Sequence, residues 1–306
     1  MTNPPLSAQL AKVRRTERRR RRYRNLVFLP ALLMLGGILY PFLLGVYYSM
    51  TRYRLIEGTT PFIGIGNYVA ILSDSGFWRS LRITLLYATA ATGVEIVLGT
   101  ACALLLHRDV PGVRYLRTLA VAPLMVPPVI AGLMWKVMME PAGGILNYLL
   151  ASVGLPAQRW LASPNTALVS LVLIDAWIFT PFVALILLAG LQALPREPYE
   201  AASVDGASPG ETFRHLTLPL LRPLIILAAL FRLMDSIKVF DVIFATTRGG
   251  PINATMVLHI RAYEEAYKSL NMGRALALSL VLFALVYGFS LILSRWWAQS
   301  ATSEGE

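Results

Sequence analysis

An all-α membrane protein with six transmembrane helices is the fold class that the sequence predicts. The 306-residue chain is 56% apolar, and only 15% of its residues are charged, against about 25% in an average soluble domain. Apolar runs of the length needed to cross a bilayer, about 20 residues, recur along the chain. The formal net charge is nevertheless +11. This combination disfavours a soluble globular domain and indicates an apolar body with its charge concentrated elsewhere.

The excess positive charge lies at the N-terminus. Residues 1–24 hold nine Lys and Arg side chains against Glu17, which gives +8 and leaves +3 for the other 282 residues. The arginine run 18–22 could contact nucleic acid, as such runs do. It directly precedes an apolar segment, however, where its ordinary role is retention on the cytoplasmic side beside anionic lipid headgroups. We therefore expect a lipid membrane as partner and no nucleic acid.

Six segments qualify or nearly qualify as membrane spans. The first is not a cleavable signal peptide, because its apolar run of about 25 residues exceeds the usual core of about 7–15. Glu95 alone interrupts the second, which also holds the only cysteine, Cys102. A single cysteine rules out an intramolecular disulfide. The expected spans are 26–50, 83–106, 115–138, 165–193, 217–240 and 273–297.

Lys and Arg in the connections predict the orientation. With the N-terminus inside, the cytoplasmic segments hold sixteen such residues and the outer segments nine; without the basic tail the count is seven against nine. The tail therefore decides the topology, and both termini are expected in the cytoplasm. The predicted organisation is a basic cytoplasmic tail at 1–24, a six-span body at 25–297 and a C-terminal tail at 298–306.

The inner connection at 194–219 predicts two short helices with a turn between them. Pro198 suits the first turn of a helix. Gly206 suits its end, because glycine tolerates the left-handed conformation. Ser208 and Glu211 then form a capping-box pattern at the start of a second helix. Since so small a unit cannot bury a core alone, docking on a partner protein is expected.

The same connection carries a pattern that resembles a known motif. It reads Glu200-Ala201-Ala202, then Gly206 four positions on, then Leu216-x-Leu218-Pro219. This pattern resembles the EAA motif of the permeases of binding-protein-dependent ABC transporters, with Leu216 where isoleucine is commoner. Residues 62–68, Phe240-Asp241 and 249–251 are similar to segments of the carbohydrate-uptake permeases of the maltose and glycerol-phosphate type. The resemblance covers about residues 25–297.

The resemblance implies a type I ABC importer permease fold with a cytoplasmic coupling helix. Glu200 would contact the ATPase, Ala201 and Ala202 would allow close approach, and Gly206 would make the turn. The implied coupling residues are Glu200, Ala201, Ala202, Asp205, Gly206, Ala207, Leu216 and Pro219. Two ATPases closing on ATP would draw such helices together and reorient the spans.

The resemblance also implies a set of partners. We expect a second permease subunit, expected to be a different chain, two cytoplasmic ATPase subunits, and an extracytoplasmic binding protein that hands over a sugar or sugar-like solute. No phosphate-binding loop pattern occurs here. The chain is therefore expected not to be an enzyme and to hold no cofactor, with ATP–Mg bound by the partner ATPase, in a bacterial or archaeal plasma membrane.

Polar residues inside spans are candidates for the solute path. Arg232, Asp235, Lys238 and Asp241 recur every three residues with alternating sign, so they could either pair with one another or line the path. Glu95 and Asp175 are single intramembrane acids that could be structural hydrogen-bonding groups. The aromatic ring of Trp177 could stack on a sugar or belong to the core.

Two other classes of function stay open. A secondary transporter for a polar solute, driven by an ion gradient, would show paired inverted repeats and no cytoplasmic docking helix. The motif at 194–219 argues against that class. A non-transporting membrane scaffold or sensor is disfavoured by the intramembrane charges.

Overall fold

The computed structural model describes residues 28, 30, 33–108 and 111–302, and these residues are largely helical. The basic tail predicted at 1–24 lies outside the described residues. In the described part the only β-type pairings are two isolated bridges, Thr51–Phe62 and Arg54–Asn271. An all-α fold follows, as the sequence predicts.

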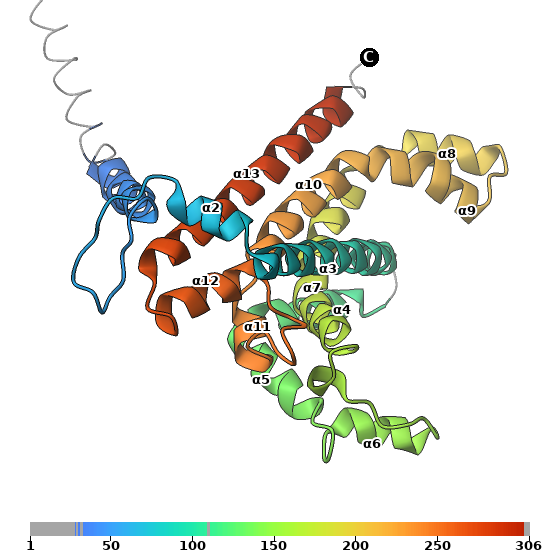
Figure 1. Cartoon of the computed structure of the whole chain (residues 1–306). Helices are drawn as coiled ribbons and strands as arrows, with labels where there is room; N and C mark the ends of the chain where they lie inside the picture. Colours follow the sequence, from blue (N-terminus) through green and yellow to red (C-terminus); the bar gives the residue numbers. More distant parts are fainter. Residues whose placement is uncertain (1–27, 29, 31–32, 109–110, 303–306) are drawn as a thin grey trace, which may run out of the picture.

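The helices surround a central group formed by α3, α7, α10 and α13, while α8 and α9 extend away from it (Figure 1). In chain order the elements are a helix Leu33–Ser49, α2 Gly66–Leu72, α3 Ser75–His107, α4 Val113–Val121, η1 Ala122–Met125, α5 Pro128–Met138, α6 Ile145–Ser152, η2 Trp160–Ala162, α7 Ala167–Ala193, α8 Glu197–Val204, α9 Pro209–Thr212, the π-helical turn η3 Phe213–Thr217, α10 Leu218–Ile237, α11 Asp241–Thr246, α12 Leu258–Tyr267 and α13 Met272–Thr302.

Four helical stretches are long and apolar enough to cross a membrane, and they coincide with four of the predicted spans. A fifth crossing forms if the bent pair described below counts as one span. The helix Leu33–Ser49 matches the described part of the first predicted span and is shorter than a full crossing. The four stretches are Ser75–His107, Ala167–Ala193, Pro209–Thr246 and Met272–Trp297.

The third predicted span, 115–138, is not one straight helix. The chain bends by 95° between Val113–Met125 and α5. Pro127 and Pro128 stand at the bend, where proline lacks an amide hydrogen and keeps the preceding residue out of the helical region. The apolar run gave the correct length but not the break.

Two helices begin earlier than the apolar pattern predicts. α3 begins at Ser75 rather than at 83, because the Asp74 side chain accepts the amide of Gly76 at 2.8 Å and so caps the helix. The second short helix, predicted to begin after Ser208, is α9, and α9, η3 and α10 follow one another without a break, so the helix that holds the fifth span begins at Pro209 rather than at 217. In both cases a polar first turn precedes the apolar run.

The core lies where α3, α7 and α10 pack together. At Gly99 of α3 a Cβ atom would lie 2.5 Å from Val183 of α7, so only glycine allows these helices to approach this closely. Tyr87 of α3 and Ile174 of α7 are fully buried in one apolar cluster with residues of α5, α11 and α12. This packing also encloses three charged side chains, Glu95, Asp175 and Arg232, inside the bundle.

Candidate functional site

The segment 194–219, named here the α8–α9 segment, forms the two short helices and turn that the sequence predicts. α8 has no buried residue. Glu200 and Ala201 are exposed, Ala202 is half-buried, and Val204 is 87% exposed. Because no other part of the chain covers the apolar side chain of Val204, this surface suits contact with another molecule.

Hydrogen bonds within the segment fix its turn. Gly206 has φ +75° and open space around it, and the amide of Ala207 donates to the carbonyl of Ala202 at 3.0 Å. Ser208 and Glu211 make the predicted capping box. The Ser208 hydroxyl and amide lower the pKa of the Glu211 carboxyl below its ordinary value. Asp205 and Ala207 beside the turn are exposed.

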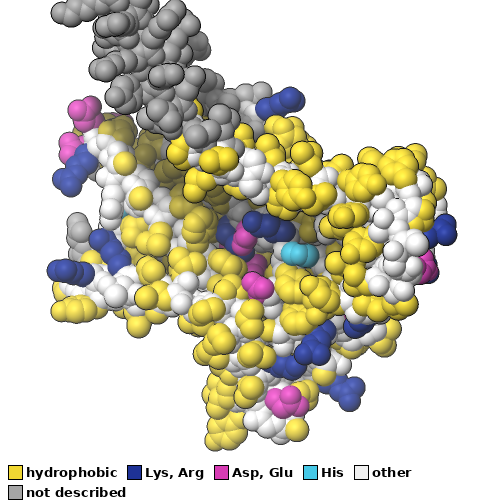
Figure 2. All heavy atoms as spheres, turned by 90° about the vertical axis from the view of Figure 1, so that its left-hand side faces the viewer, with side chains coloured by type: hydrophobic (Ala, Val, Ile, Leu, Met, Phe, Trp, Pro, Cys, Tyr) yellow, Lys and Arg dark blue, Asp and Glu magenta, His cyan; other side chains and the backbone are white. Residues whose placement is uncertain are grey.

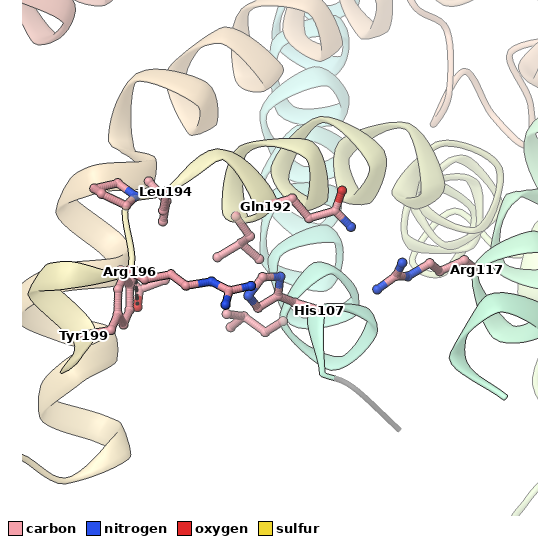
Figure 3. A pocket seen from close by; sticks show the side chains of 10 residues that line it. His107, Arg117, Gln192, Leu194, Arg196 and Tyr199 are labelled. Carbon is pink, nitrogen blue, oxygen red and sulfur yellow. Dashed lines mark hydrogen bonds between the residues drawn. The ribbon is translucent and has the colours of Figure 1, made fainter. Parts of the chain in front are cut away.

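A single side-chain bond ties α8 to the start of α10. The Tyr199 hydroxyl donates to Thr217 at 3.2 Å, while Leu216 is half-buried and Pro219 is exposed. Beside this bond a cavity of about 620 Å³ separates α8 from the ends of α3 and α7 and from Arg117 of α4. His107, Arg117 and Arg196 line it, and Arg117 points into it (Figure 3). α8 is therefore held at one end and loosely packed elsewhere.

A second polar group lies inside the bundle around Arg232 of α10, which is 2% exposed. Its Nε donates to Glu95 Oε2 at 2.5 Å and its Nη2 to Glu95 Oε1 at 2.9 Å. Nη2 also donates to Asp175 of α7 at 3.0 Å, and Nη1 to Asp235 at 2.9 Å. One guanidinium group thus joins carboxylates from three helices.

Two further contacts complete the surroundings of Arg232. Ser236 Oγ accepts from Nη2 at 3.2 Å, and the Phe179 ring lies 3.8 Å from Cζ. Ionised groups inside a membrane are costly unless they are paired and hydrogen-bonded. We name Glu95, Asp175, Arg232, Asp235 and Lys238 the charge cluster; its multiple bonds meet that requirement.

The charge cluster borders a cavity of about 490 Å³. Figure 2 shows a hollow on this side of the molecule, bordered by hydrophobic side chains, in which acidic, basic and histidine side chains gather. Among the side chains predicted for the solute path, those lining the cavity are Asp175, Arg232, Asp235, Lys238 and Asp241. Glu95 lies behind Arg232 and is fully buried.

The three-residue spacing of Arg232, Asp235, Lys238 and Asp241 suggested that all four lie on one helix, but they do not. α10 ends at Ile237, Lys238 is its C-cap, and Asp241 begins α11. The predicted pairing forms between Arg232 and Asp235, and Lys238 lies 3.5 Å from Asp235. Asp241 makes no ion pair with any residue in the described part of the chain.

Trp177 does not line the cavity. Its ring packs edge-to-face on Trp135, with centroids 5.8 Å apart, against an apolar cluster. This placement matches the core interpretation. In the described residues no group of three or more His, Cys, Asp or Glu side chains is placed to hold a metal ion.

The sequence did not predict an ion network near α12, at the end of the molecule opposite to the α8–α9 segment. Asp74 accepts from Arg261 and from Arg274, each at 2.6 Å, and Arg274 lies 3.3 Å from Glu265. Burial raises the pKa of Asp74, but the Gly76 amide and the two guanidinium groups lower it by more, so it lies below its ordinary value. The partners stand 187 and 200 positions from Asp74, so no local pattern could reveal them.

Comparison with known proteins places the chain in a family. The model of the family described as "Binding-protein-dependent transport system inner membrane component" matches residues 95–299. The chain is 40% identical to a probable ABC transporter permease protein, y4oQ, of Sinorhizobium fredii, over 89% of this chain and 90% of that protein. It is 36% identical to the trehalose/maltose transport system permease protein MalF of Thermococcus litoralis, over 87% and 90%.

A solved structure shares the fold. A chain of a bacterial ABC transporter involved in the import of the acidic polysaccharide alginate superposes with a TM-score of 0.80 at 19% identity, covering 93% of this chain and 98% of that one. The matched family model includes both the α8–α9 segment and the charge cluster. The chain therefore belongs to the family of inner membrane components of binding-protein-dependent transport systems, and it is a permease subunit rather than an enzyme.

Proposed function

We propose that this chain is the permease subunit of an ATP-driven importer that moves a sugar or sugar-like solute delivered by an extracytoplasmic binding protein. The trehalose/maltose permease is one of its relatives. The observation that carries the proposal is the continuous helical run from the exposed α8–α9 segment to the charge cluster. This run connects a surface suited to a partner with the polar cavity inside the bundle.

The α8 end of the molecule faces the cytoplasm in this proposal, and the α12 end faces outward. Both chain termini are then cytoplasmic, and the basic tail 1–24 rests beside anionic headgroups. The six-span body comprises residues 25–297, followed by the C-terminal tail 298–306. The membrane is the plasma membrane of a bacterium or archaeon.

The α8–α9 segment docks on a cytoplasmic ATPase. Exposed Glu200 and Ala201 contact the ATPase, half-buried Ala202 allows close approach, and Gly206 sets the angle between the two helices. Asp205 and Ala207 flank the turn, and Leu216 and Pro219 carry the segment into α10. The cavity behind α8 leaves room for the segment to move relative to α3 and α7.

The complete importer contains a second permease subunit, a different chain, and two ATPase subunits. ATP–Mg binds to the ATPases, and this chain holds no cofactor. When the ATPases close on ATP they favour one of two arrangements of the spans, because a ligand shifts an equilibrium by its differential affinity for the two states.

The solute passes the cavity at the charge cluster. Asp235, Lys238 and Asp241 reach that cavity from α10 and α11 with at least one exposed face, and a sugar needs such donors and acceptors for its hydroxyl groups. Arg232, held by Glu95 and Asp175, fixes the cavity wall. Trp177 supports the wall from behind.

Two glycines with a left-handed backbone conformation provide the test of coupling between the α8–α9 segment and the ATPase. Gly206 has φ +75° and Gly112, in the other turn at the same end, has φ +84°; neither has an atom within 4 Å of a Cβ. A valine is equally strained at both. In the assembled transporter, Gly206→Val should lower ATPase co-purification and solute uptake at least tenfold, while Gly112→Val should retain both.

Both variants must first elute as the native complex does on gel filtration with the second permease subunit. If Gly206→Val then keeps ATPase binding and uptake at the level of Gly112→Val, the turn does not couple the two proteins and the proposal is wrong.

A further inference from the structure

A row of aromatic rings leads from the cavity to the surface at the α12 end. We name His259, Phe240, Phe244, Tyr263 and Tyr267 the aromatic row. Phe240 stacks on Phe244 with centroids 5.0 Å apart and lies 5.0 Å from His259. Tyr263 lies 5.4 Å from Phe240 and 5.0 Å from Phe244, and Tyr267 follows 4.7 Å from Tyr263. The rings therefore form one continuous series.

The local sequence explains how the row forms on α12. His259, Tyr263 and Tyr267 are spaced by four residues, which places them on one face of the helix. Leu258 and Ile260, which flank this face on its two sides, are buried. α12 thus packs by aliphatic side chains on both sides of its aromatic face, which it presents toward α11.

The two ends of the row differ in their surroundings. Phe240 and His259 line the cavity beside the charge cluster. Tyr263 is half-buried, and Tyr267 is 67% exposed. Aromatic residues at a membrane surface commonly anchor in the lipid interface, but that role does not call for rings that continue into a polar cavity. The aromatic row reaches the surface at Tyr267 and the cavity at Phe240 and His259, so it instead offers a path between the surface and the cavity.

The charges at the cavity end select against an acidic solute. The side chains that line the cavity include three carboxyl groups, Asp175, Asp235 and Asp241, against two cations, Arg232 and Lys238. Arg232 already bonds three carboxylates, and Lys238 lies 3.5 Å from Asp235. A carboxylate on the solute would thus meet a surplus of negative charge and paired cations.

We propose that the aromatic row is the surface on which the rings of a neutral sugar stack as they pass between the outside and the cavity. The inference rests on the proposed function and adds residues and a solute class to it. The apolar C–H face of a pyranose ring packs on an aromatic face, while its hydroxyl groups bond to the polar groups of the cavity. The chemistry recognised is a neutral pyranoside rather than a uronic acid.

The test uses the assembled transporter in proteoliposomes together with its binding protein. The solute is a neutral disaccharide that the binding protein is first shown to bind. Tyr263→Ala and Tyr267→Ala should each reduce uptake at limiting loaded binding protein by about tenfold, as expected for loss of one ring contact. Tyr263→Phe and Tyr267→Phe should retain most of the uptake, because the sugar stacks on the face of the aromatic ring and does not need its hydroxyl group. Tyr148→Ala, at a 71% exposed tyrosine of α6 outside the row, is the matched control.

Three outcomes would overturn the inference. Uptake unchanged in both alanine variants removes the row from the path, and equal losses in the alanine and phenylalanine variants remove stacking as the cause. If the binding protein and the unmodified transporter select a uronic-acid disaccharide over the neutral one, the solute class is wrong. Failure of the proposed function is distinguishable, since the unmodified complex would then show neither ATP-dependent uptake nor an ATPase stimulated by the loaded binding protein.

Discussion

The α8–α9 segment and the charge cluster are both polar regions of an apolar molecule, and they are built in opposite ways. The segment is contiguous in sequence, its first helix buries nothing, and its own caps hold it together. The charge cluster draws Glu95 and Asp175 to Arg232 across 137 and 57 positions, and these three side chains are almost fully buried. We infer that the segment can be altered without unfolding the chain, whereas the cluster cannot.

Removing the guanidinium group should have the largest effect. Arg232→Met leaves two buried carboxylates, Glu95 and Asp175, without a cation to pair with, a change that costs about 3–5 kcal/mol and should lower the Tm of the purified protein by roughly 6–20 °C. Arg222→Met, at an exposed arginine of the same helix, is the control. A melting temperature within 2 °C, roughly the effect of 1 kcal/mol, of the unmodified protein would mean that the cluster does not stabilise the fold.

The close approach of α3 and α7 holds Glu95 beside Asp175, and crowding it should have the second largest effect. Gly99→Val places its Cβ atom 2.5 Å from Val183, and overpacking of this kind costs about 1–3 kcal/mol. Gly93→Val introduces the same residue on the same helix into open space. Thermal unfolding of the pair measures the packing cost directly, and equal melting temperatures would contradict it.

The ion network at the α12 end should contribute less and depend on pH. Asp74→Asn keeps an acceptor for the Gly76 amide but loses two charge pairs, worth about 1 kcal/mol together. Because the folded-state pKa of Asp74 is lowered, this stabilisation is complete above the unfolded value of about 3.9 and is lost as the pH falls through the folded value. The difference in Tm between variant and unmodified protein should therefore be present at pH 7 and shrink below about pH 3.9.

The control for this measurement is Glu57→Gln, which removes the half-exposed Arg54–Glu57 pair. It should change stability by less than about 0.5 kcal/mol at either pH. A difference for Asp74→Asn that grows as the pH falls would show that the folded-state pKa of Asp74 is raised rather than lowered, so that the protonated carboxyl stabilises the fold more than the ionised one.

The smallest effect on stability is expected in the α8–α9 segment. Val204→Ser alters a side chain that is 87% exposed and should shift the free energy of unfolding by less than about 0.5 kcal/mol. It should nevertheless weaken retention of the ATPase in pull-down assays. Val153→Ser, at a valine that is 70% exposed beside α6, should leave retention unchanged. A marked loss of stability in Val204→Ser would place the segment with the folded core.

Local patterns allowed correct prediction of local structure. The capping box at Ser208 and the glycine turn at Gly206 depend on residues a few positions apart, and both form. Apolar length likewise located the membrane helices, although it missed the capped start of α3 and the bend before α5. Single acids such as Glu95 gave no sign of their partner, because convergence on Arg232 depends on how α3, α7 and α10 pack.

The unbroken helical run from Pro209 to Ile237 makes the two regions parts of one lever. Arg232 stands 23 residues beyond Pro209, a separation of about 35 Å at the helical rise. A tilt of about 10° about one end would displace the other by about 6 Å. The π-helical turn Phe213–Thr217 gives this lever a wider, more compliant turn next to the α8–α9 segment. One residue inserted between that turn and Arg232 would rotate the guanidinium by about 100° around the helix axis. The helix could still tilt, but its movement would no longer be transmitted to the carboxylates that bond Arg232.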